Sequence, residues 1–485
     1  MDDGRHRNTG RLELTQYSIL RLRDCLPRPR RAAGNCTDSG AVMALIPASG
    51  FSGNGSAGSA PPSPLTCGAG RAEAATILAI FASSLAKVSM LAFTAGRLLT
   101  PTDAIEHPLM LVEQGRVLEI CARNMRQLPA TVSLSDLDNN VIAPGYIDLH
   151  IHGSAGYDVM DDRADALPAV EQLLARHGVT SYFPTTVTAP MESTLRALDR
   201  LADAIEQRER DREPAKAQST PRAHPLGVHL EGPFLSHARR GVHPPEYLLA
   251  PTLPLFEQFW QAARGRIRMM TIAPELAGAP EVIAEAARRG VCVSLGHSDA
   301  DFSAAERGIA AGARHATHTF NAMRPLSHNH LDHRNPGILG AVLTDRRVSA
   351  DLIADGIHLD PAIVKLIALA KGPERTVLIT DAISATGMPD GRYRLGGFEV
   401  DVREGKCTRN GSLAGSVLTM DRAVQNLARF AEWDLPQAVA AASRNPARVA
   451  RLANKGVLSA GADADFVVLN AQGEVQRTFV GGIEC

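Results

Sequence analysis

The chain has 485 residues, and its 51 basic and 52 acidic side chains give a formal net charge of −1 at pH 7. This balance argues against a chain-wide attraction to nucleic acid or to an anionic membrane, and an aromatic content of 4% leaves few platforms on which bases could stack. The seven cysteines have no CxxC spacing and no apolar run reaches the ~20 residues of a membrane span, so we expect a cytoplasmic protein that acts on a small molecule.

The first 89 residues differ in composition from the rest of the chain. Residues 1–40 are rich in Arg, and residues 47–70 consist mainly of Gly, Ser, Ala and Pro. Such a composition buries too little apolar surface to offset the conformational entropy that is lost on ordering. We expect residues 1–89 to be a disordered extension or a mispredicted start, with the ordered protein beginning near Met90.

Short strands are predicted on both sides of a long central region. Residues 90–143 contain short β-rich runs with turns between them, and residues 456–482 contain three more. The simplest arrangement is a small β-sandwich built from both chain ends, residues 90–143 and 456–485, beside a central domain of residues 144–455.

The central region alternates strands with amphipathic helices. Apolar residues recur at helical spacing in residues 164–177, 191–208 and 280–290. Eight strand–helix units favour an α/β fold with a closed (β/α)8 TIM-like barrel, in which the chemistry lies at the carboxyl ends of the strands. The eight β-rich runs are residues 141–150, 180–186, 226–233, 268–275, 291–298, 315–323, 348–358 and 375–383.

Metal-ligating side chains follow several of these strands. His150 and His152 are two residues apart, so on a strand both imidazoles point to one side and can share a metal. Glu231, His297 and His318 end the third, fifth and sixth strands, and this set suits zinc or ferrous iron with coordination positions left for water. We therefore predict one or two divalent metals per chain.

Each of these residues also has a structural interpretation. A lone HxH pair, or a lone His at a strand end, is often an ordinary polar residue, and Asp381 at the end of the eighth strand could cap the next helix. The functional alternative for Asp381 is a general base that takes a proton from an activated water. Because ligand types recur at so many strand ends, the metal site is favoured.

Several motifs resemble one enzyme family. The strings PGYIDLHIHG, HLEGPF, GHS, THTFNAM, IADGIH, TDA and GSLAGS follow the order found in the N-acetylglucosamine-6-phosphate deacetylases of the amidohydrolase superfamily, over about residues 90–482. Other members of the superfamily bridge two metals with a carboxylated Lys, but this chain has no Lys between Lys216 and Lys365. The resemblance therefore implies that Glu231 serves as the metal ligand from the strand in place of such a Lys.

The resemblance implies a role for each matching residue. Glu231, His297 and His318 would bind a metal, with His150 and His152 added in a two-metal site. Asp381 would be the acid and base, and His243 would lie near the substrate amide. The implied phosphate ligands are Arg334 and His358. The full set of implied substrate-binding residues is Val242, His243, Asn321, Ala322, Arg334, Asp355, Gly356, Ile357, His358, Leu413, Ala414 and Gly415.

The implied reaction is the deacetylation of N-acetylglucosamine 6-phosphate in amino-sugar catabolism. The resemblance also implies a homodimer in which Arg334 reaches the pocket of the neighbouring subunit. N-acetylgalactosamine 6-phosphate differs at one hydroxyl and is an alternative substrate. Another amidohydrolase activity and a catalytically inactive barrel are further alternatives, although the complete ligand set disfavours the inactive barrel.

Overall fold

The central strands form a parallel barrel. The computed structural model describes residues 90–129, 132–211, 221–328 and 334–485, and the expectation for residues 1–89 lies outside them. Each barrel strand pairs in parallel with the next one along the chain. In order, the strands are β8 (Tyr146–Ile151), β11 (Val179–Thr186), β13 (Val228–Glu231), β14 (Ile267–Ile272), β15 (Cys292–Leu295), β16 (His315–Ala316), β19 (Ser349–Leu352) and β20 (Thr376–Leu378).

The barrel closes between its last strand and its first. Ile151 at the end of β8 forms a parallel bridge with Ala382, and the N–H of Asp381 donates to the carbonyl of His150 over 2.9 Å. This closure brings the residues that follow β20 against those that end β8. The predicted (β/α)8 barrel is confirmed.

The first β-rich run of the prediction is divided between two sheets. Val141–Pro144 forms β7, which pairs outside the barrel, and β8 begins only after Gly145. A Cβ at Gly145 would lie 2.4 Å from the side chain of Thr180, so the chain can cross β11 closely only with glycine there.

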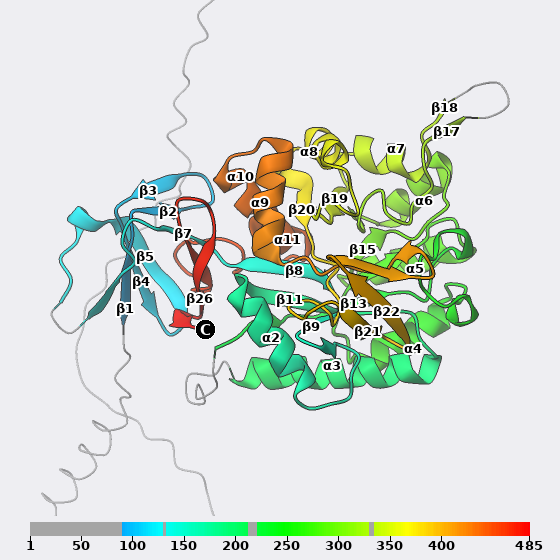
Figure 1. Cartoon of the computed structure of the whole chain (residues 1–485), viewed down its shortest axis with the longest axis horizontal. Coiled ribbons are helices and arrows are strands. Elements are labelled where there is room, and N and C mark those ends of the chain that lie inside the picture. The colour runs from blue at the N-terminus through cyan, green and yellow to red at the C-terminus, as the bar shows by residue number, and fades with distance from the viewer. Residues whose placement is uncertain (1–89, 130–131, 212–220, 329–333) are drawn as a thin grey trace, which may run out of the picture. The chain divides into compact units, whose positions relative to one another are not determined.

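Helices connect the strands and surround the barrel (Figure 1). α5 buries Val282, Ile283 and Ala286 on one face, which is the apolar stripe predicted for residues 280–290. The helices are α2 (Ala166–Arg176), α3 (Met191–Asp211), α4 (Leu253–Ala262), α5 (Ala279–Arg288), α6 (Phe302–Ala311), α7 (Gly337–Thr344), α8 (Pro361–Arg375, broken at Gly372), α9 (Met420–Ala431), α10 (Leu435–Ala442) and α11 (Arg444–Val449).

Residues 91–144 and 466–484 form a pair of small, mostly antiparallel sheets. Phe466 and Phe479 stack with ring centroids 4.4 Å apart, and Phe93 meets both rings edge-on. Burying each ring contributes ~1.5–3 kcal/mol. One sheet holds β5 (Arg116–Ala122), β4 (Pro108–Glu113), β1 (Leu91–Thr94) and β6 (Ser133–Asp136). The other holds β27 (Ile483–Glu484), β26 (Val475–Val480), β25 (Phe466–Leu469), β7, β2 (Arg97–Leu99) and β3 (Ala104–Glu106).

The predicted strands near the C-terminus are shifted. Three strands were expected within residues 456–482, but the third, β27, lies just beyond that range. Residues 456–465 are mostly turns and bends, and the buried ammonium of the preceding Lys455 pairs with the carboxylates of Asp463 and Asp465. Main-chain hydrogen bonds join residues 461–464 to residues 115–117 through an isolated antiparallel bridge, so this segment pairs without forming a strand of its own.

One antiparallel sheet was not predicted at all. It follows β20 and consists of β21 (Gly391–Leu395), β22 (Phe398–Arg403), β23 (Lys406–Arg409) and β24 (Ser412–Leu413). The turns Gly396-Gly397, Glu404-Gly405 and Asn410-Gly411 join its strands. These dipeptides between alternating side chains are typical of hairpins, so the sequence does carry the pattern.

The remaining elements are short. Among the described residues, no helix combines the length and the apolar character that a membrane crossing requires. The short elements are β9 (Gly153–Ser154), β10 (Tyr157–Asp158), β12 (His224–Pro225), β17 (Ser327–His328), β18 (Arg334–Asn335), η1 (Arg123–Met125), η2 (His237–Arg239) and η3 (Pro245–Tyr247).

Candidate metal centre and active site

The polar residues predicted at the strand ends converge at one end of the barrel. Each side chain belongs to a residue that is at most 8% exposed, although all of them are ionisable. Buried ionisable groups are stable only when they pair with one another or with a metal. The converging residues are His150, His152, Glu231, His243, His297, His318 and Asp381.

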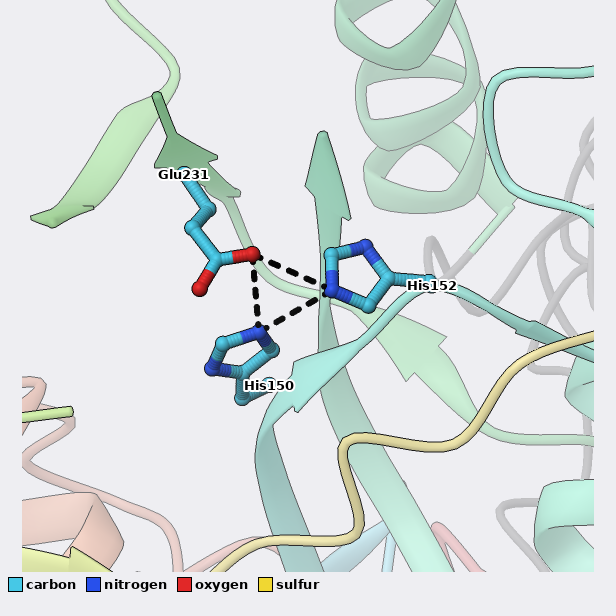
Figure 2. A group of neighbouring side chains, drawn as sticks. All are labelled: His150, His152 and Glu231. Carbon is cyan, nitrogen blue, oxygen red and sulfur yellow. Dashed lines mark hydrogen bonds and ion pairs between the residues drawn. The ribbon is translucent and has the colours of Figure 1, made fainter. Parts of the chain in front are cut away.

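Glu231 forms the first group with His150 of β8 and with His152, which follows β8. Figure 2 shows the Glu231 carboxylate directed at both imidazoles. Its Oε2 lies 3.4 Å from His150 Nε2 and 3.2 Å from His152 Nε2, and the two nitrogens are 3.2 Å apart. Three donor atoms this close to one another can hold a metal ion.

The other oxygen of Glu231 faces a second pair of imidazoles. Oε1 lies 3.2 Å from His297 Nε2 and 3.2 Å from His318 Nε2, and these two nitrogens are 3.1 Å apart. Glu231 therefore lies between two imidazole pairs and offers one oxygen to each.

Main-chain carbonyl groups orient three of the four imidazoles. The Nδ1 atoms of His152, His297 and His318 lie 3.0, 2.9 and 3.2 Å from carbonyl oxygens. A carbonyl oxygen only accepts, so each Nδ1 carries a proton, and Nε2 is the ring nitrogen that faces Glu231 and is available to a metal. This is the tautomer that metal-ligating histidines adopt. His150 differs, because its Nδ1 has no hydrogen-bond partner among the described residues.

His243 has the opposite tautomer. The N–H of Thr188 donates to His243 Nδ1 over 3.3 Å, and the Thr188 hydroxyl lies 2.8 Å from the same nitrogen. In the neutral ring the proton is then on Nε2, which is 3.6 Å from Glu231 Oε2. An N–H directed into the site suits a donor to a substrate oxygen better than a metal ligand. His243 does lie close enough to Glu231 and His297 to hold an ion with them.

Asp381 lies beside the first imidazole pair. Its Oδ1 is 3.3 Å from His152 Nε2 and 3.5 Å from His150 Nε2. The backbone of Asp381 is left-handed, with φ of 50°, and His297 and His318 share this feature with φ of 47° and 29°. Such conformations cost about 1–3 kcal/mol each outside glycine and cluster at functional sites.

The carboxylates of the site stay ionised. Burial alone would raise the pKa of Glu231, but His150 and the neighbouring imidazoles hold it well below its usual range. Asp381 is also buried, and its pKa is lowered chiefly by His150 and His152. Burial disfavours charge on His152 too, yet hydrogen bonds with the two carboxylates raise its pKa to about 10. Two buried anions attract positive charge, as a cation-binding site requires.

A cavity of about 190 Å³ opens onto this centre. Its lining includes Glu231, Asp381 and four of the histidines just described. A larger hollow of about 390 Å³ lies between β2 and α10, but the residues around it include no histidine. Of the predicted substrate-binding residues, those that line the smaller cavity are Val242, His243, Asn321, Ala322, His358, Leu413 and Gly415.

The other predicted substrate-binding residues are placed differently. Asp355, Gly356 and Ile357 are not in the cavity wall, and Ala414 is packed in an apolar cluster. Arg334 begins the short strand β18 beside a segment outside the described residues, and the position of its side chain is not described. Its role at a phosphate stays a prediction.

Asp355 orients His358. One carboxylate oxygen accepts the N–H groups of Ile357 and His358, both over 2.8 Å, and the other lies 2.7 Å from His358 Nδ1. Both oxygens of the Asp355 carboxylate thus accept hydrogen bonds from this loop. The Nε2 of His358 is left for a ligand in the cavity.

Sequence analysis missed four residues of the site. Gly241, Val187 and Leu395 line the cavity, and Thr188 sets the tautomer of His243. Gly241 directly precedes Val242, which was predicted, so the position of Gly241 could have been inferred from its neighbour. Nothing in the local sequence distinguishes Val187, Thr188 or Leu395 from ordinary strand and turn residues.

The site agrees with comparisons with known proteins. A family model described as "Amidohydrolase family" matches residues 141–484. The chain belongs to the amidohydrolase family. The predicted resemblance is thereby confirmed, and with it the prediction of a hydrolase whose relatives bind divalent metal.

Several amidohydrolases resemble this chain along most of its length. The N-acetylgalactosamine-6-phosphate deacetylase of Escherichia coli O157:H7 is 39% identical over 73% of this chain and 90% of the relative. The N-acetylglucosamine-6-phosphate deacetylase of Lysinibacillus sphaericus is 37% identical over 70% of this chain and 84% of the relative. The solved structure of the N-acetyl-D-glucosamine-6-phosphate deacetylase of Mycobacterium smegmatis has a TM-score of 0.72 at 34% identity, covering 82% of this chain and 99% of that one.

Proposed function

We propose that this amidohydrolase converts N-acetylglucosamine 6-phosphate and water into glucosamine 6-phosphate and acetate. The observation that carries the proposal is the position of Glu231, whose two oxygens face two imidazole pairs while Asp381 lies beside one of them. Relatives named for this substrate match 70% or more of the chain, which supports the choice of an amino-sugar phosphate.

The donor set fits a divalent metal. Glu231, His297 and His318 would hold one ion, and His150 and His152 would hold a second one with Glu231. Imidazole and carboxylate donors suit zinc or ferrous iron, so we propose one or two such ions per chain. When bound, the metal polarises the acetamide carbonyl and lowers the pKa of a water molecule.

Asp381 moves the proton of the reaction. Its pKa is held low, so the carboxylate is ionised and accepts a proton from the attacking water. As the C–N bond breaks, Asp381 returns this proton to the departing nitrogen of the sugar. His243 donates from Nε2 to the carbonyl oxygen while negative charge develops there.

The sugar phosphate would occupy the polar side of the cavity. Asn321 and His358 line this side. Asp355 accepts from His358 Nδ1 and so orients the ring, whose Nε2 donates to a phosphate oxygen when the ring is an imidazolium. We propose that Arg334 binds the phosphate through paired N–H groups, from the neighbouring subunit of a homodimer. A cytoplasmic location fits the cysteine pattern and the metabolite class of the substrate.

Acetate release from four substrates tests the proposal. The substrates are N-acetylglucosamine and N-acetylgalactosamine, each with and without the 6-phosphate, and the galacto epimer is included because one relative is named for it. We expect the highest kcat/KM for N-acetylglucosamine 6-phosphate. A higher value for the galacto epimer would assign that substrate instead. No acetate from any phosphorylated sugar, with metal-loaded protein, would refute the proposal.

A further inference from the structure

The tip of an antiparallel hairpin forms part of the cavity wall. β21 ends at Leu395, which pairs with Phe398 across the turn Gly396-Gly397. Leu395 is 2% exposed and lines the cavity together with Asp381 and His243. A hairpin tip usually carries polar residues that face solvent, so an apolar side chain buried there needs an explanation.

The hairpin tip packs directly against Val187. A Cβ at Gly396 would lie 2.2 Å from Val187 Cγ1, and φ of Gly396 is 55°, so the turn reaches this position only with glycine. Val187 follows β11, is 2% exposed and also lines the cavity. The next residue, Thr188, holds His243 through its N–H and hydroxyl. The apolar contact is therefore adjacent to the proposed oxyanion donor.

Hydrogen bonds hold the hairpin tip in place. The N–H of Gly396 donates to Asp158 Oδ2 over 2.6 Å, and the Ser384 hydroxyl donates to the carbonyl of Arg394 over 2.5 Å. Val242 packs against the same apolar cluster as Val187 and Leu395, and Arg409 from β23 donates to its carbonyl over 2.7 Å. The wall formed by Val187, Val242 and Leu395 is thus fixed in position by groups outside the cavity.

The cavity lining includes an apolar group and a polar group: Val187, Val242 and Leu395 pack in one cluster, and the Asn321 amide donates to the carbonyl of His358. A scissile carbonyl must lie between Asp381 and the Nε2 of His243, because these groups move the proton and stabilise the oxyanion. The nitrogen of the amide carries a polar sugar phosphate, which the polar group of Asn321 and His358 can accept. The acyl substituent of the carbonyl is left to face the apolar wall.

We infer that Val187, Val242 and Leu395 form an acyl pocket that sets the length of the acyl group that can be removed. The inference rests on the proposed deacetylation and adds the residues that select the acyl group. One extra methylene against a fixed apolar wall changes kcat/KM by roughly 10–200-fold. The protein should therefore discriminate strongly between acetyl and longer acyl groups.

The test measures amine release from N-acetyl, N-propionyl and N-butyryl glucosamine 6-phosphate with the metal-loaded full chain. We expect the natural protein to prefer acetyl over propionyl by tenfold or more. Leu395→Ala and Val187→Ala should each reduce this preference at least tenfold by admitting the longer chains. Val400→Ala is the matched control, since Val400 is buried in the same sheet but does not line the cavity.

The outcomes separate the inference from the proposed function. If the natural protein releases no amine from the acetyl substrate, the proposed function fails and the inference falls with it. If it hydrolyses acetyl and propionyl substrates equally, or if both cavity variants keep the acetyl preference of the Val400→Ala control, only the acyl pocket is refuted. Circular dichroism identifies a variant that does not fold. In that case the acyl preference of the other cavity variant tests the acyl pocket.

Discussion

The carboxylate of Asp148 accepts a hydrogen bond from the hydroxyl of Thr380, with Oδ2 and Oγ1 2.6 Å apart, across the line where the barrel closes. Its Oδ1 also accepts the backbone N–H groups of His150 and Thr380, over 3.2 and 3.3 Å. Thr380 directly precedes Asp381. One buried carboxylate thus connects the main chain at His150 to Thr380, the residue before the proposed general base.

Thr380→Val should weaken this connection. The substitution keeps the shape of the side chain but leaves a carboxylate oxygen of Asp148 without its hydroxyl donor in a fully buried position. A lost hydrogen bond to a charged group costs ~1.5–3 kcal/mol. We expect the free energy of unfolding, measured in urea, to fall by about that amount and kcat to fall with it.

Thr186→Val is the control for this prediction. The Thr186 hydroxyl is also buried in a barrel strand, but it has no hydrogen-bond partner among the described residues. Its replacement by a methyl group should be neutral or slightly stabilising. Equal losses of stability in the two variants would show that the hydrogen bond to Asp148 is not the cause.

Asp381→Asn should abolish turnover, because an amide cannot take a proton from water. A general base contributes at least ~10²-fold, so we expect kcat to fall by that factor or more. Metal content and substrate affinity, measured by elemental analysis and calorimetry, should change little. Near-normal turnover in this variant would mean that another residue is the base.

Glu231→Ala should remove metal from both imidazole pairs, since one oxygen faces each pair. His150→Ala should affect only the first pair, to which His150 belongs. Elemental analysis of the purified proteins measures the difference directly. If Glu231→Ala retains as much metal as His150→Ala, the carboxylate does not serve both pairs.

Arg334→Ala should raise KM for the phosphorylated sugar far more than for the same sugar without phosphate. A charge-assisted pair contributes ~1.5–3 kcal/mol, which corresponds to a roughly ten- to hundredfold penalty. Mixing this variant with Asp381→Asn should restore some activity if Arg334 acts across a dimer. Equal KM changes for both sugars would remove Arg334 from the phosphate site.

Removal of residues 1–89 should leave folding and activity intact. The prediction rests on their composition and on the first described strand, which begins at Leu91. Soluble yield, melting temperature and acetate release of the shortened protein are the measurements. A shortened protein that is insoluble or inactive would contradict it.

The strand ends of the barrel could be predicted from sequence because the apolar run of each strand stops there and a helical pattern follows. Apolar runs of strand length alternate with helical patterns, and His150, Glu231 and Asp381 stand where the runs stop. The position of such residues relative to one another follows from the barrel alone.

Other features depend on contacts between distant segments. The tautomer of His243 is set by Thr188, 55 residues away, and Leu395 reaches the cavity only because Gly396 fits against Val187. No local pattern encodes these pairings. The hairpin sheet, in contrast, had recognisable Gly-containing turns that sequence analysis did not use.

The proton positions of His152, His297 and His318 are governed by the carbonyl groups of Thr185, Arg239 and Asn321, respectively. Every amino acid has a carbonyl group, whatever its side chain. Replacing Thr185 or Arg239 would therefore change the side chains around the centre but would keep the carbonyl oxygen that orients His152 or His297. The orientation of these imidazoles therefore depends on the course of the main chain, and it can persist while the side chains around them change.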